Sequence, residues 1–171
     1  MEKSKNKIKR LALNAALASL AIIMGYIEAV IPINIGIPGI KIGFANIVTV
    51  IAISLFGFAD AFVIGLVRVL TVGLLFSNFS MLVFSIGGFL ISIAVMQFFK
   101  LLLKRGIIVC SMFGAISHNV TQIIIASIIM DNFYIWKKYL AVLIMVAVLT
   151  GILIGTISFV CYKTIKKYFN S

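Results

Sequence analysis

Apolar runs long enough to cross a lipid bilayer fill most of this sequence. The chain has 171 residues, of which 63% are hydrophobic and 11% are charged. A globule of this size cannot hide so much apolar surface from water. Since about 20 apolar residues cross the hydrocarbon core, the chain has room for roughly six short-looped helices. The sequence therefore predicts a single all-α integral membrane domain over residues 1–171.

The breaks between the apolar runs predict a bundle of six transmembrane helices. They are expected at about residues 11–31, 42–56, 61–76, 81–103, 107–130 and 139–162. The second of these is short for a membrane span.

The segment from Pro32 to Val50 interrupts the apolar pattern without becoming hydrophilic. Its prolines and glycines prevent a continuous helix, because proline removes a backbone donor and glycine makes ordering costly. Irregular backbone at membrane depth is tolerated only where protein or a water-filled cavity satisfies its polar groups. We therefore expect this irregular Gly/Pro segment, between the first two helices, to form one wall of a binding cavity.

Basic residues are distributed in the pattern of the positive-inside rule. The formal net charge is +11, and most of the lysines and arginines fall in residues 3–10, 100–105 and 163–167, separated by even numbers of predicted spans. Such clusters mark cytoplasmic ends and contact anionic lipid headgroups. We expect a multi-pass protein of the plasma membrane with both termini cytoplasmic. The charges form no contiguous base-reading face, which argues against a nucleic-acid partner.

Outside the basic clusters, two charged residues lie inside predicted spans and are candidates for ligand binding. Arg68 stands near the middle of the third helix and Glu28 near the outer end of the first. A charged group at the bilayer centre costs at least ~2.5 kcal/mol, so each needs a partner. Arg68 either contacts an anionic ligand or pairs with Glu28, and the sequence leaves both open. Glu28 can also be a solvated residue at the headgroup level.

Polar residues elsewhere in the apolar sequence are further ligand-binding candidates. Two lie in the irregular segment, one follows the third helix, where it can also cap the fourth, and three lie together in the middle of the fifth. They are Lys41, Asn46, Asn78, His118, Asn119 and Gln122. A single intramembrane histidine is often only a packing residue, but two amides at the same depth favour a site. The chain has one histidine and two cysteines without metal-binding spacing, so no metal and no cofactor are expected.

Small residues on the first helix are spaced for close helix packing. Ala12 and Ala16 lie one turn apart on one face, which lets another helix approach closely in lipid. Internal packing and docking of a partner protein explain this spacing equally well.

Three motifs resemble a known bacterial membrane family. The segments IGIPGIKIGFANIVTV (Ile35 to Val50), RVLTVGLLFSNFS (Arg68 to Ser80) and SHNVTQ (Ser117 to Gln122) occur in the order seen in Gx transporters, also called heptaprenyl diphosphate synthase component I. That family resembles in turn the substrate-binding S components of energy-coupling factor (ECF) transporters, which are six-helix bundles. The resemblance implies a membrane coupling subunit and cytoplasmic ATPases as partners, and it favours docking through Ala12 and Ala16.

The resemblance and the residues together predict a non-enzymatic transport component. The expected function is capture of a small, vitamin-like or isoprenoid-like, anionic molecule. The alternative is a non-catalytic membrane accessory subunit of heptaprenyl diphosphate or quinone synthesis. Prenyl elongation needs clustered carboxylates that hold Mg²⁺ against a diphosphate, and the four carboxylates of this chain are dispersed. The chain also lacks the phosphate-binding motif GxxxxGK[ST], so any ATP hydrolysis would come from a partner.

Overall fold

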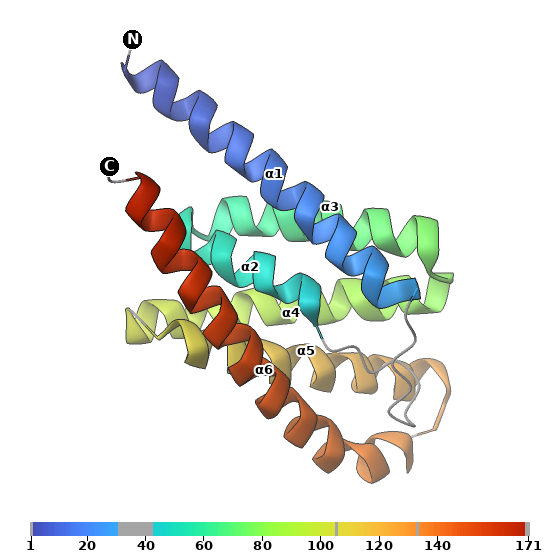
Figure 1. Ribbon diagram of the computed structural model, residues 1–171. Helices are drawn as coiled ribbons and strands as arrows, with labels where there is room; N and C mark the ends of the chain where they lie inside the picture. Colours follow the sequence, from blue (N-terminus) through green and yellow to red (C-terminus); the bar gives the residue numbers. More distant parts are fainter. Residues whose placement is uncertain (1, 31–42, 105, 133, 170–171) are drawn as a thin grey trace.

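The computed structural model describes residues 2–30, 43–104, 106–132 and 134–169 (Figure 1). Within these ranges the regular structure is entirely helical, which confirms the all-α class. The six helices are α1 (Glu2–Val30), α2 (Phe44–Leu55), α3 (Phe58–Phe76), α4 (Phe79–Leu103), α5 (Ile107–Ile129) and α6 (Tyr134–Phe169).

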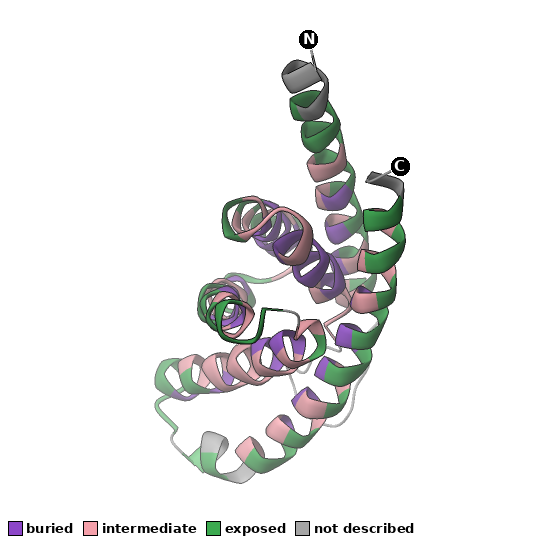
Figure 2. Ribbon diagram, turned by 90° about the vertical axis from the view of Figure 1, so that its left-hand side faces the viewer, coloured by how far each residue is buried: buried purple, intermediate pink, exposed green. Residues whose placement is uncertain are grey.

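Helix α2 is the centre of the bundle. It contacts each of the other five helices, which follow one another around it in the order α1, α3, α4, α5, α6. In the described part of the chain, α1 and α6 do not contact each other, and α2 packs against both. No residue of α2 is exposed, and most are fully buried. Figure 2 shows the buried residues where the helices face one another and the exposed ones on the outer faces.

Five of the six helices are long and apolar enough to cross a membrane. Helix α2 has 12 residues, so it is about 18 Å long, well short of the hydrocarbon core. It begins after Gly43 and ends before Gly57, both of which have positive φ angles (86° and 98°) that favour glycine. A membrane protein is therefore supported, whereas the count of six spans stays a prediction.

The two terminal helices are longer than the sequence predicted. Helix α1 begins at Glu2 instead of near residue 11, and α6 covers Tyr134–Phe169 instead of 139–162. Hydropathy marks only the part of a helix that lies in lipid, while lysine is a good helix former and lets both helices continue into polar flanks. The other bounds agree with the prediction to within one turn, and the predicted residues 31 and 42 lie outside the described ranges.

The basic clusters lie at one end of the bundle. The N-terminus, the C-terminus and the α4–α5 connection are on the same side in Figure 1, opposite the ends of α1 and α3. This arrangement is the one that the charge distribution predicted.

Glycines allow close contact between neighbouring helices. A Cβ atom on Gly151 would stand 2.6 Å from the Cα atom of Met112, and one on Gly155 would stand 2.8 Å from the Cα atom of Ile108. These glycines of α6 therefore bring its backbone against the backbone of α5, as their GxxxG spacing suggests.

Lys100 stabilises the carboxyl end of α2. Its ammonium group, on α4, donates a hydrogen bond to the backbone carbonyl of Ile53, one of the last carbonyls of the buried helix. Lys100→Met is expected to lower the free energy of unfolding by about 1–3 kcal/mol, because that carbonyl loses its partner. Thermal unfolding in mild detergent measures the effect. Lys7→Met, at an exposed position of α1, is the control, and an equal loss in the two variants would contradict the role.

Candidate functional site

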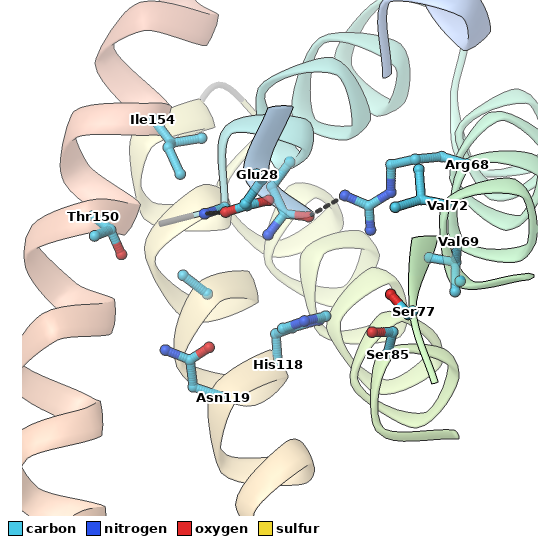
Figure 3. Close-up of a pocket in the computed structure, with 14 residues that line it drawn as sticks. Glu28, Arg68, Val69, Val72, Ser77, Ser85, His118, Asn119, Thr150 and Ile154 are labelled. Atoms are coloured by element: carbon cyan, nitrogen blue, oxygen red, sulfur yellow. Dashed lines mark hydrogen bonds between the residues drawn. The ribbon is translucent and has the colours of Figure 1, made fainter. Parts of the chain in front are cut away.

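A cavity lies at the end of the bundle where α1 ends and α2 begins. Its volume is about 50 Å³, and side chains from all six helices line it. Its polar lining comprises Glu28, Asn46, Arg68, Ser77, Ser85, His118, Asn119 and Thr150. Figure 3 shows Arg68 extending from α3 towards Glu28, with His118 and Asn119 on α5. The structure therefore brings together five of the residues predicted from the sequence.

Glu28 is held at the start of α2. Its Oε1 atom accepts a hydrogen bond from the backbone N–H of Gly43, the residue that precedes α2. The first N–H groups of a helix lack partners within the helix, and a carboxylate is a favourable partner for them. Glu28 thus joins the outer end of α1 to the start of the central helix.

Arg68 is buried, with 8% of its surface exposed. Its Cγ atom would lie 3.7 Å from a Cβ on Gly25, so the aliphatic part of the side chain crosses α1 at a residue without a side chain. Its Nη1 atom donates to Oδ1 of Asn46 over 3.4 Å, which is long for a hydrogen bond. Within the described ranges this is its only hydrogen bond, so most of its donors are available to a ligand.

Arg68 and Glu28 line the same cavity and do not form an ion pair. Among the described residues the one ion pair is Arg10 with Asp60. The two charges are close enough to attract each other, yet the guanidinium donates to Asn46 and the carboxylate accepts from Gly43. The sequence left two roles open for Arg68, contact with a ligand and pairing with Glu28. The structure shows no direct pair with Glu28.

His118 reaches the cavity because α4 carries glycine where it meets α5. Its Nδ1 and Cε1 atoms would lie 2.9 Å from a Cβ on Gly88, so a larger residue there would displace the imidazole. Helix α4 runs unbroken through this position, and Gly88 therefore serves close packing. Asn119 follows His118 and also lines the cavity.

Two predicted site residues are placed away from the cavity lining. Asn78 is exposed and caps α4, where its Oδ1 atom accepts from the N–H of Met81 over 2.9 Å. Gln122 packs beside Gly88 and is not among the residues that line the cavity. Lys41 lies outside the described residues.

Two of the polar lining residues could not be recognised from the sequence. Ser85 comes from α4 and Thr150 from α6, a helix that was not expected to contribute to the cavity. The hydroxyl of Thr150 also donates to the carbonyl of Val146 in its own helix over 2.9 Å. Serine and threonine hydroxyls commonly donate to a carbonyl of the preceding turn of their own helix, so an isolated hydroxyl in an apolar run does not indicate a site.

The small-residue face of α1 is exposed. Ala12 and Ala16 are both exposed, as are the neighbouring Ala15 and Ser19. Among the described residues, then, no other helix covers that face.

Beside this face, α1 and α3 enclose a mostly apolar hollow of about 350 Å³, with Asp60 at its polar end. Asp60 lies in the first turn of α3. It also pairs with Arg10 and accepts from Nδ2 of Asn14 over 2.9 Å, which ties the basic end of α1 to α3.

Metal-ligating side chains are dispersed. In the residues described, no three of the His, Cys, Asp and Glu side chains come together as a metal site. Cys110 and Cys161 are both free thiols.

Comparison with known proteins gives one match. The sequence model of the family described as heptaprenyl diphosphate synthase component I matches residues 17–160. No curated protein and no solved structure matches the chain.

Proposed function

The chain belongs to the heptaprenyl diphosphate synthase component I family, and from this premise we propose that it is the membrane substrate-binding subunit of a transport system. The observation that carries the proposal is the cavity, into which a buried Arg68 projects with most of its donors uncommitted. Burying a charge without a full set of partners is costly, and binding sites are where such groups are retained. The small molecule would enter from the outer face.

The lining residues have distinct roles in this proposal. Arg68 and Lys41 attract an anionic group, and Asn46 and Asn119 fix its orientation. His118 donates or accepts one further hydrogen bond. Asn78 and Gln122 support the site from outside the cavity, by capping α4 and by packing on Gly88. The cavity in this structure suits a small polar molecule or headgroup better than an isoprenoid chain, since polar side chains from six helices surround it.

Native mass spectrometry of the protein purified in mild detergent tests this function. A retained small molecule together with coupling and ATPase subunits would support a transport component. A purified protein without any retained molecule, and unaffected by a broad set of metabolites, would contradict it.

A second function is favoured by the family description. A component of heptaprenyl diphosphate synthase implies a partner subunit, which would supply the carboxylates and Mg²⁺ that prenyl transfer requires. The chain would then be a non-catalytic membrane accessory subunit. Co-purification with a carboxylate-rich synthase, and altered prenyl products on deletion with normal uptake, would favour this function over transport.

Partner docking is proposed to use the exposed small-residue face of α1. Ala12→Leu and Ala16→Leu are each expected to abolish co-purification of the partner and uptake, because a leucine keeps an approaching helix at a distance. Binding of the small molecule should be unchanged, since neither residue lines the cavity.

Ala94→Leu is the matched control for this prediction. Ala94 is also exposed but lies on α4. The docking role would be contradicted if uptake survived both α1 substitutions, or if Ala94→Leu abolished it equally.

A further inference from the structure

We infer that the cavity binds a zwitterion, with its anionic group at Arg68 and its ammonium group at Glu28. This inference rests on the proposed binding function and goes beyond the anionic ligand predicted from the sequence. It comes from the fact that the structure places both charged side chains on one cavity without joining them to each other.

Within the part of the chain that the structure describes, each of the two charges has few partners of its own. Arg68 is 8% exposed and donates one long hydrogen bond to a neutral amide. Glu28 is half-buried and accepts one backbone N–H, that of Gly43. A guanidinium offers five donors and a carboxylate about four acceptor positions, so both retain capacity for a bound molecule.

Charge balance selects a ligand that carries both signs. Among the described side chains that line the cavity, Glu28 is the carboxylate and Arg68 is the guanidinium, so the two carry opposite charges. If a simple anion bound at Arg68, its negative charge and that of Glu28 would face the single positive charge of Arg68 in a space of low dielectric. If a simple amine bound at Glu28, two positive charges would face one negative charge. A zwitterion supplies a counter-charge to each of these two side chains.

Geometry favours a small ligand with closely spaced charges. Gly25 and Glu28 lie on neighbouring turns of α1, and Arg68 crosses α1 at Gly25. The two charged groups therefore face the cavity from adjacent positions. Their remaining partners Asn46, His118 and Asn119 are neutral hydrogen-bonding groups that suit the polar remainder of such a molecule.

Two sources can supply this chemistry. A free amino-acid-like metabolite carries an ammonium and a carboxylate, and a phosphatidylethanolamine headgroup carries an ammonium and a phosphate. The experiment below separates the two sources.

Matched probes test the inference by thermal stabilisation of the purified protein. The panel consists of ω-amino acids from glycine to 6-aminohexanoate, the carboxylic acid of each without its amine, the amine of each without its carboxylate, and glycerophosphoethanolamine. We expect at least one zwitterion to raise the melting temperature at a concentration at which its single-charge partners do not. A response to glycerophosphoethanolamine alone assigns a lipid headgroup, and a response to an amino acid assigns a free metabolite.

Glu28→Gln is the variant that identifies the ammonium contact. Glutamine keeps the size of the side chain and an oxygen for the N–H of Gly43, but it loses the charge. We expect the preference for the zwitterion over its deaminated acid to fall at least about tenfold, even if overall stability changes. A preference that survives this substitution would overturn the assignment.

Failure of the inference is distinguishable from failure of the proposed function. If the acids stabilise the wild-type protein as well as the zwitterions do, or a co-purified molecule carries only one charge, the zwitterion is excluded while the binding function stands. If no probe stabilises the protein and native mass spectrometry finds no retained molecule, both are overturned.

Discussion

Gly151→Ala is expected to lower the free energy of unfolding by about 1–3 kcal/mol, because the new methyl group meets backbone that cannot move aside. It would stand 2.6 Å from the Cα atom of Met112 and 3.2 Å from the Cβ atom of Ala115, both on α5. The two helices must then separate along their whole contact.

Labelling of Cys110 during thermal unfolding measures this loss. Cys110 lies on α5 with 5% of its surface exposed, so a thiol-reactive dye reports when the helix opens. A Cys161→Ser background removes the second free thiol.

Gly87→Ala is the control that isolates the role of backbone. A Cβ on Gly87 would approach only the Cδ1 atom of Ile125, the end of a flexible side chain that can rotate away. We expect it to cost clearly less than Gly151→Ala, and equal losses would show that backbone contact does not limit the α5–α6 packing.

Arg68→Ala is expected to weaken binding of the retained molecule by about 30- to 3,000-fold. Truncating one partner of a desolvated charge pair typically costs about 2–5 kcal/mol, and each 1.4 kcal/mol is tenfold in affinity. Arg68→Lys should recover little of this, because a lysine cannot make the forked contacts of a guanidinium. The dissociation constant of the molecule identified by mass spectrometry is the measurement, with a melting curve for each variant.

Two further substitutions make this prediction specific. Lys41→Ala is expected to weaken binding less than Arg68→Ala, because Arg68 is buried in the middle of a helix. Asn78→Ala should leave binding nearly unchanged, although it removes the cap of α4 and so costs about 1 kcal/mol of stability. A loss of affinity in Asn78→Ala as large as that in Arg68→Ala would contradict the placement of the site.

The small-residue face shows how far a sequence pattern can be taken. The spacing of Ala12 and Ala16 indicated close packing but not the packing partner. The structure leaves both residues exposed and places the internal contacts of α1 on another face, which includes Leu17 and Ala21. Which side of a helix is covered depends on where the neighbouring helices lie, and that information is not local.

The sequence by itself determined the class of protein and the approximate positions of the helices. Apolar runs must be removed from water, and the polar or irregular breaks between them mark where one span ends and the next begins, so the helices could be located from the hydropathy pattern alone. The isolated charges Glu28 and Arg68 indicated a site for the same local reason, since a charge in an apolar span requires a partner.

Only the tertiary structure decided which polar groups meet. Asn78 and Gln122 carry the same amide group as Asn46 and Asn119. Asn78 nevertheless caps α4, and Gln122 packs on Gly88. Thr150 joins the cavity because α6 packs closely on α5 through Gly151. Arg68 and Glu28 share a cavity without pairing because Asn46 and Gly43 hold them separately. Such contacts depend on the packing of helices distant in the chain, which no local pattern records.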